Sequence, residues 1–76
     1  MRTQVTAKLE DGVNTMLRVV GTLRRKEFYV LDVEMRDLSG KAGSELTLTL
    51  DGDGDLTRRA VHQMEKVYGV SGIKML

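Results

Sequence analysis

The chain contains no cysteine, no proline and no tryptophan, and the absence of cysteine is the most restrictive of these. Without cysteine no disulfide can stabilise the fold, and a zinc site would depend on carboxylates and the single histidine. We therefore expect no metal site in this chain. Disulfides are rare in the reducing cytoplasm, so a cysteine-free sequence fits the cytoplasmic location that we expect.

An excess of charge of one sign and a long hydrophobic run are also missing. The 12 Lys and Arg residues are balanced by 11 Asp and Glu residues, which gives a net charge of +1. General binders of nucleic acids or anionic membranes usually carry a clear basic excess, so we expect neither partner. No apolar run approaches the roughly 20 residues of a membrane span, and residues 1–12 lack the apolar core of a signal peptide.

The 76 residues have room for one hydrophobic core, so we predict a single domain over residues 1–76. A core of this size rarely stabilises a monomer by more than about 3–5 kcal/mol. Since the sequence offers neither disulfides nor a metal site, association with another chain is the remaining source of stability. We therefore expect an oligomer.

The spacing of apolar residues predicts six elements. Val5, Ala7 and Leu9 alternate with polar neighbours, as in a half-buried strand. After an acidic turn, apolar residues recur at helical intervals from Val13 to Leu23. The full pattern predicts a strand at 3–9, a helix of about 14 residues, strands at 28–35 and 45–50, a helix at 56–68 and a short strand after Gly72.

The same periodicity predicts which faces are buried. Apolar residues occupy both alternations of 28–35, which indicates a bulge, or an edge strand covered by a partner chain. The two alternations are Tyr29, Leu31, Val33 and Met35 on one side, and Phe28 and Val30 on the other. The expected helical faces are Val13, Met16, Leu17, Val20 and Leu23, with Val19 beside them, and Leu56, Ala60, Val61, Met64, Val67 and Tyr68.

Polar and glycine residues mark the ends of these elements. We expect Asp11 or Asn14 to cap the first helix and Asp55 to cap the second. Gly69 is expected to end the second helix. A loose turn at 39–44 joins the second and third strands.

The predicted order is β-α-β-β-α-β. With right-handed crossovers these units form an α+β, ferredoxin-like sandwich, in which a four-stranded antiparallel sheet carries both helices on one face. RNA-recognition domains share this topology and stack bases on aromatic residues of the two central strands. Here those strands, at 3–9 and 45–50, carry no aromatic residue. We therefore expect no nucleic-acid binding.

Two groups of residues resemble a calcium-binding loop and a catalytic site, but neither has the full set of residues that such a site requires. Asp51, Asp53 and Asp55 are spaced like calcium ligands, but the glycine and glutamate required at positions six and twelve are Leu56 and His62. That histidine is the only one, and no nucleophile motif accompanies it. We therefore predict no catalytic and no metal-binding residues.

The Asp11-Gly12-Val13 turn is the strongest candidate for a binding site. The free backbone N–H groups of a helix N-terminus attract small anions such as an amino-acid carboxylate. The alternative is that Gly12 only allows a tight strand-to-helix turn.

Basic residues gather at two further places, 24–26 and 58–59. These positions are either a solvated face or a docking surface for an acidic partner.

The turn and the helix after it resemble the ACT domains, and most closely the small regulatory subunits of acetolactate synthase. Their characteristic stretch reads Asn-x-Pro-Gly-Val-Leu, then Arg-Val or Arg-Ile, then Arg-Arg-Gly-Tyr/Phe-Asn-Ile. The motif-level match covers about residues 9 to 35. It consists of Gly12-Val13, Arg18-Val19, Gly21, Arg24-Arg25, Phe28 and Val30, with Val33 and Met35 continuing the strand.

This resemblance implies a function in branched-chain amino-acid biosynthesis. The chain would be a non-catalytic subunit that binds the catalytic large subunit of acetolactate synthase and favours its active conformation. Thiamine diphosphate, Mg and FAD would belong to that large subunit, and this chain would hold no cofactor. The longer small subunits carry a second domain, so a chain of 76 residues resembles the short, single-ACT form.

The resemblance also implies the residues of the effector site and the dimer interface. ACT domains often pair edge to edge through the second strand and the first helix, so we expect a homodimer through Phe28, Leu31, Val33 and Met35. A small amino acid would bind Asp11, Gly12 and Val13 of one chain and Tyr29 and Val30 of the other. Where the family has an asparagine that helps to hold valine, this chain has Tyr29, whose phenol cannot replace the donors of an amide. We therefore expect valine insensitivity.

Two other readings remain open. The chain can instead be a free-standing ACT domain that senses a small amino acid or regulates another metabolic enzyme. It can also be a structural assembly domain, with neither a ligand nor a synthase partner.

Overall fold

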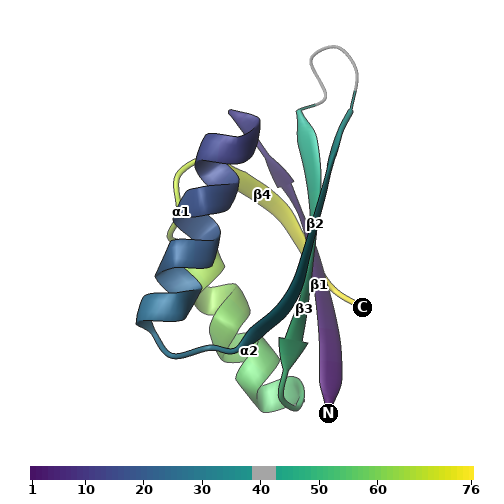
Figure 1. Cartoon of the computed structure of the whole chain (residues 1–76), viewed down its shortest axis with the longest axis vertical. Coiled ribbons are helices and arrows are strands. Elements are labelled where there is room, and N and C mark those ends of the chain that lie inside the picture. The colour runs from purple at the N-terminus through teal and green to yellow at the C-terminus, as the bar shows by residue number, and fades with distance from the viewer. Residues whose placement is uncertain (39–42) are drawn as a thin grey trace.

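The computed structural model of the chain describes residues 1–38 and 43–76. Six elements follow one another in the predicted order (Figure 1): β1 (Arg2–Leu9), α1 (Gly12–Arg25), β2 (Val30–Asp37), β3 (Ser44–Asp51), α2 (Gly54–Met64) and β4 (Val70–Met75). Most of the loose turn predicted at 39–44 lies outside the described residues.

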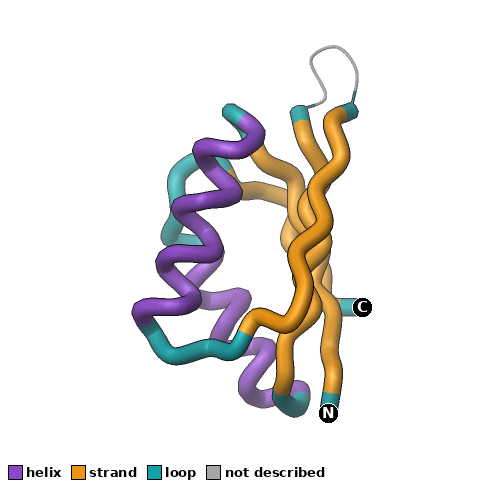
Figure 2. The backbone as a smooth tube through the Cα atoms, viewed as in Figure 1, coloured by secondary structure: helices purple, strands orange, loops and turns teal. Residues whose placement is uncertain are grey.

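The four strands form one antiparallel sheet in the order β2-β3-β1-β4. Both helices lie on the same face of this sheet, and the other face is open (Figure 2). The ferredoxin-like βαββαβ sandwich predicted from the sequence is therefore confirmed. The central strands are β1 and β3, so β2 and β4 each have one side without a strand partner in the described part of the chain.

The core lies between the central strands and the helices. In β3, Leu46, Leu48 and Leu50 are fully buried, while Thr47 and Thr49 alternate with them on the open face. Full burial of a large apolar side chain contributes roughly 1.5–3 kcal/mol, so this layer is the main source of stability. The other buried apolar side chains are Val5, Ala7, Leu9, Val19, Leu23, Ala60 and Met64.

The buried face of α1 differs from the predicted one. Val13 and Leu17 are 54% and 59% exposed, so the prediction that both are buried was wrong. The fully buried row is Thr15, Val19 and Leu23, which recur every four residues. The apolar stripe of α1 is wider than the face that contacts the sheet, and its outer part remains at the surface.

A threonine hydroxyl is the physical reason for this rotation of α1. The side chain of Thr15 is completely buried, and its Oγ1 donates a hydrogen bond to the backbone carbonyl of Glu10 at the end of β1. A buried hydroxyl is tolerated only when it has such a partner. A prediction from apolar periodicity treats threonine as a surface residue. It therefore centred the buried face of α1 on the wrong side of Val19, toward Val13 and Leu17.

Both predictions for the ends of α2 were wrong. Asp53, rather than Asp55, caps the helix, because its backbone is extended and its Oδ1 accepts a 2.9 Å hydrogen bond from the N–H of Leu56. α2 ends at Met64, well before Gly69, so Tyr68 lies outside the helix and is 83% exposed. The left-handed backbone of Gly69 (φ +92°) serves the turn into β4.

The predicted bulge in the second strand is confirmed, and it lies at Leu31. Val30 pairs with Leu50 and Val33 pairs with Leu48, so between these pairs β2 has two residues where β3 has only Thr49. Val30 and Val33 therefore share the helix-facing side, so the predicted placement of these two valines on opposite alternations was wrong.

The caps of α2 generate a stability prediction. Replacement of Asp53 by alanine removes the side-chain acceptor of the first turn and is expected to lower the free energy of unfolding by about 1 kcal/mol. Asp53→Asn keeps an equally good capping group and should cost only a few tenths of a kcal/mol. Urea unfolding of the two variants makes the comparison, and an equal loss in both would contradict the assigned cap.

Candidate functional site

The turn between β1 and α1 has the sharp left-handed geometry that the glycine indicated. Asp11 (φ 61°) and Gly12 (φ 41°) are both left-handed, and the N–H of Asn14 donates to the carbonyl oxygen of Asp11 at 3.1 Å. Neither predicted capping side chain acts as one, because Asp11 occupies the N-cap position without a side-chain cap bond. Among residues 1–38 and 43–76, no side chain accepts a hydrogen bond from the backbone N–H groups of the first turn of α1.

A shallow pocket of about 410 Å³ lies beside this turn, lined by Glu10, Asp11, Thr15, Arg18, Tyr68 and Gly69. The guanidinium of Arg18 donates to Thr15 Oγ1 at 2.9 Å and to the carbonyl of Tyr68 at 3.5 Å. The pocket therefore combines two carboxylates with one guanidinium. Such a charge pattern is complementary to a zwitterion, whose ammonium seeks carboxylates and whose carboxylate seeks a guanidinium.

Sequence reasoning missed Thr15 and Tyr68 as parts of this pocket. It included Arg18 only through the family resemblance. The N–H of Glu10 donates to the carbonyl of Gly69 at 2.8 Å, which brings the end of β1 against the start of β4. No local pattern signals this contact, because the two segments are far apart in the chain. The order of strands in the predicted sheet was the only available indication.

Within one chain the predicted effector residues do not come together. Asp11, Gly12 and Val13 lie at the start of α1, and Tyr29 and Val30 follow its other end. A helix of 14 residues is about 21 Å long, so one small ligand cannot span both groups. A site made of both groups requires two chains.

The predicted dimer residues divide into two kinds. Leu31 and Val33 are 38% and 37% exposed on the free edge of the sheet, whereas Phe28 and Met35 are half-buried and pack against the core of their own chain. Only Leu31 and Val33 thus offer apolar surface to another chain.

The three aspartates at the end of β3 and the start of α2 each have a partner within the chain. Asp51 accepts from the N-terminal ammonium, Asp53 caps α2 and Asp55 pairs with Arg58. Among residues 1–38 and 43–76, no three side chains of the kinds that bind metals form a cluster. In the same ranges no helix has both the length and the apolar character needed to cross a membrane.

Four antiparallel strands in the order β2-β3-β1-β4, with two helices on one face, define a ferredoxin-like βαββαβ domain. The chain belongs to the ACT domain family, whose sequence profile matches residues 11–73. This match begins at the turn described above and extends into β4. No curated protein sequence matches the chain.

Solved structures of several different proteins share the fold. The acetolactate synthase small subunit of Thermotoga maritima superposes with a TM-score of 0.86 at 16% identity, over 99% of this chain and 47% of that one. The ACT domain of GTP pyrophosphokinase from Chlorobium tepidum gives 0.76 at 15%, over 100% and 97%. The regulatory subunit of aspartate kinase from Thermus thermophilus gives 0.68 at 14%, over 96% and 50%.

These likenesses establish the fold. The chain spans about half the length of the acetolactate synthase small subunit that it matches. It spans nearly the whole of the ACT domain from GTP pyrophosphokinase.

Two glycines of α1 test the geometry of the turn. Gly12→Ala places a Cβ on a left-handed residue and is expected to lower the free energy of unfolding by about 1–2 kcal/mol, although the Cβ itself would make only an ordinary 3.6 Å contact with Ser44 Oγ. Gly21→Ala in the right-handed part of the same helix should raise it by about 0.4–1 kcal/mol. Thermal and urea unfolding measure both, and effects of the same sign would contradict the described backbone.

Proposed function

We propose that this ACT domain is the small regulatory subunit of an acetolactate synthase and that it activates the catalytic large subunit. The residues that match the family stretch, from Gly12-Val13 to Val30, carry the proposal. The fold shared with the acetolactate synthase small subunit of Thermotoga maritima supports it. Thiamine diphosphate, Mg and FAD belong to the catalytic subunit in this proposal.

Activation requires only that the ACT domain bind one state of the large subunit better than another. Binding that is about tenfold tighter to the active conformation shifts the equilibrium by about 1.4 kcal/mol. No chemistry is needed from this chain.

The proposed active form is a homodimer joined at the edge of β2. Leu31 and Val33 provide apolar surface on that edge, and Val13 adds exposed apolar surface on α1. Arg18 and Arg25 line the side of α1 beside the segment that follows α2. Val13 is five residues before Arg18, about 140° away around the helix axis, so we place Val13 on the flank toward β2. The free edge of the sheet and an apolar helix flank thus lie on one side of the molecule.

Antiparallel pairing of two β2 edges would complete the effector site. β2 begins near the C-terminal end of α1 and runs back toward its N-terminal end (Figure 1). A second β2, running in the opposite direction, begins where the first one ends. The second chain's Tyr29 and Val30 would then lie at the same end of the molecule as Asp11, Gly12 and Val13.

Valine is not the effector that we propose for this site. Tyr29 is 66% exposed and carries a phenol in place of the amide of the family motif. We therefore propose an activating, valine-insensitive subunit.

The second candidate function is a free-standing sensor of a small amino acid, or a regulator of another metabolic enzyme. The pocket beside the turn favours it, because Glu10, Asp11 and Arg18 offer partners for both charges of an amino acid. Titration calorimetry of the chain against the common amino acids separates the candidates. Saturable binding that is lost in Gly12→Val would favour the sensor.

Reconstitution tests the proposed function directly. Purified acetolactate synthase catalytic subunit from the same organism is assayed with increasing amounts of this chain, and the mixture is analysed by size-exclusion chromatography. We expect a saturable rise in activity, co-elution, and no inhibition by valine. If the chain neither co-elutes with the enzyme nor changes its rate, the proposal is wrong.

The dimer is tested with one substitution on each edge of the sheet. Val33→Asp places a charge in the proposed interface and is expected to give a monomer in sedimentation velocity. Met75→Asp places the same charge on β4, where the native side chain is similarly exposed (43% against 37%), and should leave the dimer intact. The reverse pattern would place the interface on β4.

A further inference from the structure

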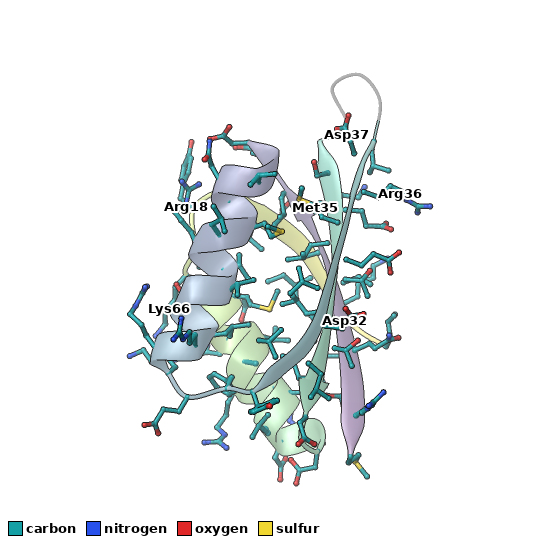
Figure 3. The ribbon with its side chains drawn as sticks, in the orientation of Figure 1. Arg18, Asp32, Met35, Arg36, Asp37 and Lys66 are labelled. Atoms are coloured by element: carbon teal, nitrogen blue, oxygen red, sulfur yellow. The ribbon has the colours of Figure 1, made fainter. Side chains whose placement is uncertain are left out.

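A groove on the helical layer lies between α1 and the segment that follows α2. Its volume is about 500 Å³. Figure 3 shows Arg18 and Lys66 on this layer, on the side of the molecule away from the sheet. The lining side chains are Leu17, Arg18, Thr22, Arg25, Lys66, Val67 and Tyr68.

The groove is rich in uncompensated positive charge. Arg18, Arg25 and Lys66 give it three formal positive charges and its lining contains no carboxylate, although the whole chain has a net charge of only +1. Within residues 1–38 and 43–76 none of these three cations has a carboxylate oxygen within 4.0 Å, whereas Arg36 and Arg58 do. Clustered cations without counter-charges attract anionic groups. Only water and dissolved salt screen the repulsion among them.

Hydrogen bonds hold the two arginines in place. The guanidinium of Arg18 is fixed by Thr15 Oγ1 and the carbonyl of Tyr68, as described above. Arg25 donates to Thr22 Oγ1 at 3.3 Å. Each arginine therefore uses one nitrogen within the chain and keeps further N–H donors for a carboxylate.

The groove also has an apolar part. Leu17 and Tyr68 are among the most exposed large apolar side chains of the described residues, at 59% and 83%, and half-buried Val67 lies between Lys66 and Tyr68. Exposed tyrosine and arginine beside aliphatic side chains are typical of the residues that contribute most to protein–protein binding. A pure anion site would not need this apolar surface.

The groove stays open in the proposed dimer. It uses the flank of α1 that faces α2, whereas the dimer uses the flank that faces β2. Each dimer would therefore present two such grooves on its helical layer, one on each chain.

We propose that this groove docks an acidic segment of a partner protein, in which carboxylates flank one apolar side chain. The inference rests on the proposed function in one respect, namely that the partner is the catalytic subunit. Carboxylates of the segment bind Arg25, Lys66 and the free face of Arg18, and its apolar side chain lies against Leu17 and Tyr68. A nucleic acid fits less well, because one exposed aromatic ring beside aliphatic groups offers little base stacking.

The first test uses fluorescence anisotropy with a labelled peptide, Glu-Glu-Phe-Asp-Glu, and the full chain. We expect saturable binding that weakens with added salt, and binding at least about tenfold weaker in the double variant Arg25→Glu/Lys66→Glu, because attraction becomes repulsion. The double variant Arg59→Glu/Lys74→Glu changes the net charge equally outside the groove and should bind like the wild type. Thermal unfolding of both variants checks that they remain folded.

Three results with the phenylalanine peptide would overturn the proposal, and a fourth comes from a control peptide. The three are no binding by the wild type, equal loss in the two double variants, and equally tight binding of an oligonucleotide of matched charge. A peptide with serine in place of phenylalanine should bind more weakly, and unchanged affinity would leave an anion site only and contradict docking of an apolar side chain.

The same variants against the acetolactate synthase catalytic subunit separate this inference from the proposed function. If the wild type and the Arg25→Glu/Lys66→Glu variant bind that subunit equally, the groove is not the surface that docks it. The proposed function would then still stand. If the wild type does not bind the subunit at all, the proposed function fails, and the peptide measurement still decides whether the groove binds acidic segments.

Discussion

The buried hydroxyl of Thr15 is the contact on which the candidate site depends. It donates to the carbonyl of Glu10 at the end of β1, and it accepts from the guanidinium of Arg18, which also reaches the carbonyl of Tyr68. Thr15, together with the arginine that it holds, thus connects β1, α1 and the segment that leads into β4. Because a buried hydroxyl must stay paired, this network fixes the rotation of α1 about its axis.

That rotation determines what α1 presents at the surface. With Val19 and Leu23 in the core, Val13, Leu17 and Arg18 remain exposed on the outer face of α1. One flank of the helix is then apolar and lies near an unpaired strand, while the other is basic and lines a groove. In the proposed assembly the apolar flank contacts a second copy of the chain, and the basic flank contacts an acidic segment of a partner.

The sequence predicted the strands better than the helices. Clean alternation in 45–50 gave the correct buried face of β3, because a period of two leaves only two choices. A helix such as α1 can in principle turn to many angles about its axis. The hydrogen bond of buried Thr15 selects one of them. The glycine turn was predictable from Gly12 alone, but the pocket beside it was not. Arg18 and Tyr68 are 50 residues apart, and their contact exists only through the sheet order.

The measurement that tests the two-flank account most directly is amide hydrogen exchange of the chain, alone and with the acetolactate synthase catalytic subunit. Outward N–H groups of an unpaired edge strand exchange quickly, so a dimer joined at β2 predicts slow exchange along β2 already in the chain alone. Addition of the catalytic subunit should then protect residues 17–25 and 66–68. Fast exchange along β2, or new protection confined to the open face of the sheet, would contradict the account.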